Sequence, residues 1–163
     1  MRLKRVQRWS DVEWLRWSLS HLPETILELA SPEWWLLHEQ KYSFMGISKR
    51  FTAALGDRDP ETTTCYDSRL NAVMLHPSTD HVSTPVHEFG HAVDRALGWP
   101  SRYLEYSGTP LDPYAAINHG ERFAQVFTAY FRGPRSPRLW LLHNVDDARR
   151  LEPDLSAFIE SLT

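Results

Sequence analysis

The sequence predicts an α+β fold in which a small, mostly antiparallel sheet packs against several helices. Two long segments, 83–97 and 118–132, repeat apolar residues at helical spacing between recognisable start and stop signals. A short apolar run at 71–76 follows turn-forming residues and a β-prone run at 62–66, which predicts a hairpin. The chain has 163 residues and is 42% hydrophobic, so it can form one domain with a sizeable core.

The N-terminal part is expected to contain two helices and one strand. A capping-box pattern at 10–13 precedes apolar residues and predicts a helix over about 11–21. A proline then ends this helix and can open a short second helix over 23–29. Residues 34–37 (WWLL) are too few for periodicity to separate strand from helix, and we favour the strand. Residues 41–61 contain loop formers and are assigned to loops.

The hairpin is expected to lead directly into the helix over 83–97. Several polar residues at 80–84 are suitable N-caps, and Pro85 suits the first turn. Gly98 marks the end of the helix. Residues 98–114 are rich in Gly, Pro and aromatic residues, which predicts an irregular connection.

The C-terminal part is expected to be helical. Asn118 should cap the helix over 118–132, and Gly133 should end it. Further helices are expected over 136–142 and 153–162. The predicted organisation is a single domain over 1–163, with N-terminal helices in 1–30, the hairpin and its helix in 62–97, and C-terminal helices in 118–162.

The sequence HEFGH at positions 87–91 places two imidazoles four positions apart, with a carboxylate beside the first. On an α-helix this spacing puts His87 and His91 on one face, where both can bind the same cation. Glu88 lies about 100° around the helix from His87, so it would border the cation without ligating it. Composition alone gives roughly one chance match in forty such sequences, so the motif indicates the layout of a zinc hydrolase without proving it.

A catalytic zinc site takes three protein ligands and leaves the fourth position to water, so a third ligand must come from elsewhere in the fold. Glu121 is the leading candidate because it lies in the first turn of the next well-formed helix. A glutamate three residues after an N-cap such as Asn118 often only completes a capping interaction, and the local sequence does not choose between the two roles. Other candidates are His119, His76 and His81, although single histidines are mostly structural or solvated.

The composition argues against nucleic-acid and membrane partners. The formal net charge is −3, and neither sign of charge forms long runs. The one basic cluster, at positions 2–8, is expected to be a solvated tail or helix face. No apolar run approaches the ~18 residues that are needed to span a bilayer.

The compartment is only weakly indicated. The N-terminus lacks the apolar stretch of a secretion signal, so we expect a cytoplasmic protein as written, or a trimmed mature form of a secreted one. The single cysteine, Cys65, excludes an internal disulfide, which fits a reducing compartment without requiring one. We expect Cys65 to be buried in the hairpin, rather than to be a reactive thiol or a ligand that blocks zinc in a latent state.

Two separated motifs resemble the catalytic domain of anthrax-toxin lethal factor and its relatives, which include the small bacterial Pro-Pro endopeptidases. The first motif is HEFGHAVD at 87–94 and the second is ERFAQVF at 121–127, with Tyr114 and Asn118 between them. The resemblance is strongest over about 71–131 and is weaker outside it. Members of this family are gluzincins, zinc peptidases whose third ligand is a glutamate on the helix that follows the H-E-x-x-H helix.

The resemblance implies a zincin-like fold, with an active-site helix and a following helix that bears the glutamate. By matching position it also implies three ligands for one Zn²⁺ per chain, a general base, and a hydroxyl that faces the substrate carbonyl. The ligands would be His87, His91 and Glu121, the base Glu88, and the hydroxyl that of Tyr114.

Two more positions are compared with the family pattern. Gln125 is a departure, because the family usually has a carboxylate there, one turn beyond the glutamate ligand, that orients the first histidine. An amide can accept the imidazole N–H but polarises the ring less. Asp94 matches the family and lies one turn beyond His91, where it either supports the site or only satisfies a nearby backbone group.

The expected function is zinc-dependent hydrolysis of peptide bonds by a monomeric metalloendopeptidase that acts on a peptide or protein substrate. An extended substrate would add alongside the strand of Val73, Met74 and Leu75, if that strand lies at the sheet edge. Two alternatives stay open: a catalytically silent relative that binds peptides or regulates, and a zinc amidase that acts on a small acyl substrate. Retention of Glu88 argues against the silent relative, because a binding module has no need of the base.

Overall fold

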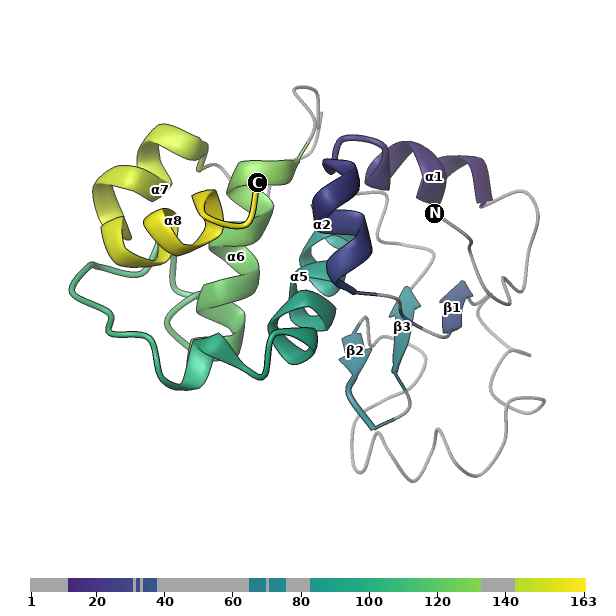
Figure 1. Cartoon of the computed structure of the whole chain (residues 1–163), viewed down its shortest axis with the longest axis horizontal. Helices are drawn as coiled ribbons and strands as arrows, with labels where there is room; N and C mark the ends of the chain where they lie inside the picture. The colour runs from purple at the N-terminus through teal and green to yellow at the C-terminus, as the bar shows by residue number, and fades with distance from the viewer. Residues whose placement is uncertain are drawn as a thin grey trace.

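Helix α5 lies at the centre of the fold, between the sheet on one side and helix α6 on the other (Figure 1). The computed structural model describes residues 12–30, 32, 34–37, 65–69, 71–75, 83–132 and 143–163. None of the helices in these residues is long and apolar enough to cross a membrane. The predicted α+β class is confirmed by these elements: α1 (Val12–Leu19), α2 (Glu24–Leu29), β1 (Trp34–Leu37), β2 (Cys65–Asp67), β3 (Ala72–Leu75), α5 (Ser83–Ala96), the 3-10 helix η1 (Pro100–Arg102), α6 (His119–Phe131), α7 (Val145–Leu151) and α8 (Pro153–Glu160).

The three described strands form one sheet in the order β1-β3-β2. Strand β1 runs parallel to β3, with Trp34 opposite Ala72, whereas β2 runs antiparallel to β3, with Cys65 opposite Met74. The sheet is therefore mixed rather than mostly antiparallel. A tight hairpin joins β2 to β3, whereas the long stretch of chain between β1 and β3 allows the parallel return.

Side-chain hydrogen bonds hold the turn of the predicted hairpin. Asp67 Oδ1 accepts a hydrogen bond from the backbone N–H of Arg69 at 2.9 Å. Asn71 adopts the left-handed conformation, with a φ of 48°, which asparagine tolerates well. Its Oδ1 accepts from the Tyr66 hydroxyl at 2.8 Å, so the turn is tied to strand β2.

Helix α5 is covered on most of its surface, because it contacts α1, α2 and α6 as well as β2 and β3. Polar residues of the helix are consequently buried together with apolar ones, among them His87, Glu88 and Asp94. Such groups are costly to bury unless they find partners. The helix ends as predicted, where Gly98 and then Trp99 take left-handed conformations with φ values of 79° and 65°.

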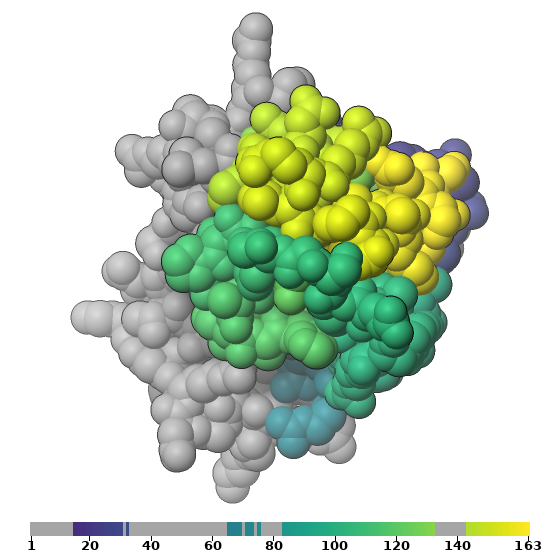
Figure 2. Space-filling view, turned by 90° about the vertical axis from the view of Figure 1, so that its left-hand side faces the viewer, coloured from purple at the N-terminus to yellow at the C-terminus, as the bar shows by residue number. Residues whose placement is uncertain are grey.

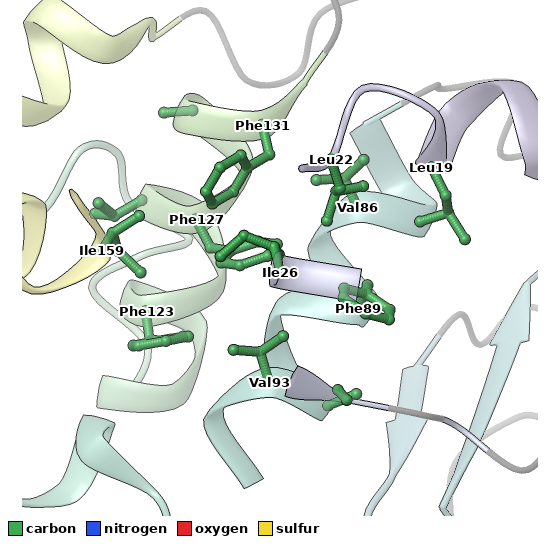
Figure 3. Close-up of a cluster of buried hydrophobic side chains, with 14 of the residues drawn as sticks. Leu19, Leu22, Ile26, Val86, Phe89, Val93, Phe123, Phe127, Phe131 and Ile159 are labelled. Carbon is green, nitrogen blue, oxygen red and sulfur yellow. The ribbon is translucent and has the colours of Figure 1, made fainter. Parts of the chain in front are cut away.

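The main hydrophobic core lies between α5 and α6 and is closed by the N-terminal helices (Figure 3). Phe127 of α6 lies in its middle, with its ring centroid 6.4 Å from the rings of Phe89 and Phe123 and 4.7 Å from that of Phe131. Gly90 lets the two helices approach, because a Cβ there would lie only 3.1 Å from the Phe127 ring. The core therefore brings the backbone of α6 close to the HEFGH segment.

The connection between α5 and α6 is irregular apart from η1, as predicted, and is fixed against the C-terminal helices. The Thr109 N–H donates to the carbonyl of Leu151 at 2.7 Å, and a Cβ at Gly108 would overlap the same carbonyl. Asp154 of α8 accepts a hydrogen bond from the Ser107 N–H at 3.1 Å. Figure 2 shows α7 and α8, in yellow, across the upper part of this face and the green middle segments of the chain directly below them.

Helix α7 begins at a capping box. Asn144 Oδ1 accepts from the Asp147 N–H at 3.0 Å, and Asp147 Oδ2 accepts from the Asn144 N–H at 3.3 Å. Local signals had not led to a helix here, although the N-x-x-D pattern was readable. The predicted helix at 136–142 lies outside the described residues, and the predicted last helix is confirmed as α8.

Replacing Phe127 by alanine is expected to lower the free energy of unfolding by about 3–5 kcal/mol, because the ring is fully buried and its removal leaves a cavity. Urea denaturation followed by circular dichroism measures this change. The control is Tyr103→Ala, at a side chain that is 64% exposed, and its effect should stay within about 0.5 kcal/mol. Equal effects of the two substitutions would contradict this placement of the core.

Candidate metal centre

Three side chains from two helices meet at one point. The Glu121 Oε2 atom lies 3.1 Å from Nε2 of His87 and 3.4 Å from Nε2 of His91. The potential ligand atoms of the three residues all lie within 4.8 Å of one another. This partly buried group could hold a metal ion, and it joins the residues predicted as ligands.

Local structure explains how the three side chains converge. His87 and His91 are one turn apart on α5, and their ring centroids lie 4.9 Å from each other. On α6, Asn118 Oδ1 accepts a hydrogen bond from the Glu121 N–H at 2.9 Å, which fixes the first turn. The Glu121 carboxylate faces the two imidazoles and not the cap, so of the two roles left open for this residue the structure favours that of a ligand.

Electrostatics at this point favour a charged carboxylate. Burial raises the pKa of Glu121, but the hydrogen bonds from His87 and His91 outweigh it and lower the pKa well below the usual range. Burial lowers the pKa of His91, but the hydrogen bond to Glu121 and the nearby charge of Glu88 raise it overall. A negatively charged carboxylate oxygen that lies beside two imidazole nitrogens can bind a divalent cation together with them.

Glu88 is buried beside this group, with only 5% of its surface exposed. Burial raises the pKa of its carboxyl group, and His87, His91 and a backbone hydrogen bond from Tyr66 oppose that shift. Its Oε2 atom has no hydrogen-bond partner among the described residues. Glu88 therefore presents an oxygen that can accept a proton close to the candidate metal position.

A cavity of about 380 Å³, called the cleft below, opens over the metal group. It is of the size that binds small ligands or a few residues of a peptide. Its lining comes from the hairpin, from α5, from the connection after α5 and from the start of α6: Cys65, Tyr66, Ser68, Glu88, His91, Trp99, Tyr114, Ile117, Asn118 and Glu121.

The predicted residue Tyr114 lies in this cleft. Its side chain is 41% exposed, and its ring centroid lies 5.8 Å from that of His87. Cys65 is half-buried and also lines the cleft, so it is less enclosed by the hairpin than expected. The reason is that Cys65 belongs to β2, which has a partner strand on only one side among the described strands.

The sequence reasoning had not assigned Ile117 to the site. Its side chain is 63% exposed, although it is large and apolar. It directly precedes the N-cap Asn118, where an apolar residue often packs on the fourth helical position, but that position is Arg122. Ile117 therefore has no apolar partner within the helix that follows it. This lack could have indicated from the sequence that its side chain faces a ligand.

The predicted substrate strand was to lie at the sheet edge, and this condition is not met among the described strands. Val73, Met74 and Leu75 belong to β3, which is the central strand and pairs with β1 on one side and β2 on the other. The backbone of β3 therefore has no open edge for a substrate, and the Val73 and Leu75 side chains are buried. The described strand that borders the cleft is β2.

The two predicted supporting residues, Asp94 and Gln125, differ in their contacts. Asp94 accepts hydrogen bonds from the Ser101 N–H at 2.9 Å and the Ser101 hydroxyl at 2.6 Å, so it anchors η1, as one of the two alternatives required. Gln125 is fully buried, and neither its Nε2 nor its Oε1 has a hydrogen-bond partner among the described residues. The hydrogen bond that this amide could accept from the His87 imidazole is therefore absent.

Of the rival histidines, His119 does not join the group. His119 is exposed, and its ring lies 4.5 Å from the ring of Tyr106. His76 and His81 lie outside the described residues. Within the described part of the chain, Glu121 is thus the third member of the group.

The geometry of these residues carries the functional interpretation. Comparisons of the chain with models of known families, with curated proteins and with solved structures find no match.

Proposed function

We propose that the protein is a zinc-dependent metalloendopeptidase. The observation that carries this proposal is the separation of the ligand atoms: Glu121 Oε2 lies 3.1 and 3.4 Å from the Nε2 atoms of His87 and His91. A tetrahedral zinc ion with bonds of about 2.0–2.1 Å spaces its ligand atoms roughly 3.4 Å apart. Two imidazoles and one carboxylate are also a donor set of catalytic zinc sites, in which water takes the fourth position.

When bound, zinc would polarise the substrate carbonyl and lower the pKa of the attacking water towards neutrality. Glu88 would take up the proton of that water at Oε2, which is buried beside the imidazoles. Its raised pKa suits this role, because the carboxylate must accept a proton and then return it to the leaving amine. A site that served binding alone would have no use for this group.

The cleft offers a place for an extended substrate. Tyr114 would donate a hydrogen bond from its hydroxyl to the substrate carbonyl oxygen, because its exposed side chain lines the cleft close to His87. We propose β2, and not β3, as the strand along which the peptide lies. Exposed Ile117 would give this cleft an apolar contact for a substrate side chain.

The arrangement supports membership of the gluzincins, and the two matching motifs support the lethal factor-like branch with its zincin-like fold. All three ligands, Glu88 and Tyr114 come from one chain, so a monomer suffices for the proposed activity. Incubation of the zinc-loaded protein with a peptide library, with and without a chelator, tests the function. We expect cleavage that the chelator abolishes, whereas hydrolysis of small acyl amides with intact peptides would indicate an amidase instead.

Glu121→Ala is expected to remove most of the bound metal, because two histidines alone hold zinc poorly. Elemental analysis after dialysis should give about one zinc per chain for the parent protein and nearly none for the variant. Glu105→Ala, at an exposed position of the connection, is the control and should keep its zinc. Unchanged zinc content in Glu121→Ala would reassign the third ligand.

Glu88→Ala is expected to retain zinc but to lower kcat/KM by about 10²–10⁴, because the base that accepts the proton is lost. Elemental analysis and peptide cleavage are measured on the same preparation. The combination of full zinc content and lost turnover separates this role from that of the ligands. A variant with undiminished cleavage would remove the base assignment.

Tyr114→Phe is expected to lower kcat by about 10², since one hydrogen bond to the developing oxyanion is removed. Tyr103→Phe removes a hydroxyl from an exposed ring that does not line the cleft, and its kcat should equal that of the parent protein. If Tyr114→Phe also kept the parent kcat, the tyrosine would have a packing role only.

A further inference from the structure

A second cavity, of about 360 Å³, adjoins the cleft. The two cavities share His91, Trp99 and Asn118, so a chain that lies in the cleft can continue into the second cavity. Its volume is sufficient for one or two side chains. The rest of its lining is mostly polar: Asp94, Ser101, Arg102, His119 and Gly120.

The carboxylate in this lining, that of Asp94, does not face a ligand. Asp94 is fully buried, and its two oxygens accept hydrogen bonds from the N–H and the hydroxyl of Ser101 at 2.9 and 2.6 Å. Its oxygens are inaccessible to a bound group because the side chain is fully buried, although its charge still acts on Arg102. The groups that remain for a ligand are therefore those of the exposed residues of the lining.

Two of those exposed residues, Arg102 and His119, can donate hydrogen bonds to an anion. The guanidinium carbon of Arg102 lies 4.6 Å from the centroid of the Trp99 ring, and the side chain forms no ion pair with a carboxylate of the described residues. The N–H groups of a guanidinium lie in its own plane, so an arginine that packs over an aromatic ring can still donate them to a ligand. His119 is also exposed on the same lining and offers a second donor.

Trp99, whose ring packs against Arg102, has an unfavourable backbone conformation. It has φ 65° and ψ 56°, a left-handed conformation that is uncommon for a bulky residue. A hydrogen bond of 2.7 Å from its N–H to the Asp94 carbonyl keeps it there. Residues held in such conformations are concentrated at functional sites, and this one lines both cavities.

We propose that the second cavity binds a carboxylate of the substrate, held by Arg102 and His119 next to the scissile bond. The carboxylate belongs either to an acidic side chain or to the end of the substrate chain, since both present the same chemistry. An arginine can bind both oxygens of a carboxylate at once, which gives direction as well as charge. The proposal rests on the proposed function, because it takes the substrate to lie across the metal group.

Peptide hydroxamates test this proposal without requiring turnover, because the hydroxamate binds zinc and the peptide extends from it. Matched tripeptides carry Glu or Gln at each position, with the hydroxamate at either end, and calorimetry gives their Kd for the zinc-loaded protein. We expect Glu at one position to bind at least tenfold more tightly than Gln at low salt, and less so at high salt. Tripeptides with a free or an amidated C-terminus show whether the chain end supplies the carboxylate.

Variants assign the effect to the cavity. Arg102→Gln should abolish the preference for Glu and leave the Kd of the Gln peptide unchanged, and Arg102→Glu should favour a Lys peptide instead. Arg150→Gln removes the same charge from a side chain on α7 that is 66% exposed and lies outside both cavities, and it should keep the preference. A preference that survives Arg102→Gln would overturn the assignment.

The outcomes separate the two proposals. Hydroxamates that bind the zinc-loaded protein without distinguishing Glu, Gln or a free chain end would overturn the carboxylate site and leave the proposed function intact. Absence of both zinc uptake and hydroxamate binding would overturn the proposed function, and the carboxylate site with it.

Discussion

The close packing of α5 against α6 is the constraint on which the candidate metal group depends. His87 and His91 come from α5 and Glu121 comes from α6, so the carboxylate reaches both imidazoles only if the helices approach closely. Gly90, between the two histidines, permits this approach, because a Cβ there would lie 3.3 Å from the Cα of Ala124 on α6. A larger side chain would have to push α6 outward. The variable positions of the H-E-x-x-H motif are thus restricted here by helix packing as well as by chemistry.

The same packing buries polar residues of α5, and their burial lowers the stability of the fold unless they form hydrogen bonds. His87, Glu88 and Asp94 are all buried, and a buried polar group without a partner costs about 1–3 kcal/mol. Asp94 avoids this cost through Ser101. The Oε2 atom of Glu88 has no hydrogen-bond partner among the described residues. The same holds for the Nε2 and Oε1 atoms of Gln125 on α6. The unpartnered oxygen of Glu88 is consistent with the role of a proton acceptor that we propose for it.

Local signals allowed most of the helices and the histidine pair to be predicted, whereas the choice of Glu121 came from the family resemblance and the pairing partners could not be predicted. Asn118 and Gly98 act within a few residues of their own position, and the two histidines need only the pitch of a helix. Whether β3 is an edge or a central strand depends on β1, which lies far away in the sequence, and its apolar run fits either position. The spacing of four residues likewise predicts that Glu121 and Gln125 share one face of α6. It does not predict which group lies next to the Gln125 amide. Properties that depend on a distant segment require the structure.

The C-terminal helices contact the candidate metal group through Arg122, the residue next to Glu121. Arg122 donates hydrogen bonds of 2.6 and 2.8 Å to the two oxygens of Glu152, which is 1% exposed, and one of 2.7 Å to the carbonyl of Gly108. Its guanidinium also lies over the ring of Tyr106. These contacts join the first turn of α6, the connection that carries Tyr114, and the junction of α7 and α8. Because breaking a buried ion pair costs about 3–5 kcal/mol, neither Glu121 nor the connection can move far by itself. This side of the cleft is therefore held in place by the fold itself, and a substrate of the proposed peptidase would have to fit walls that are already fixed.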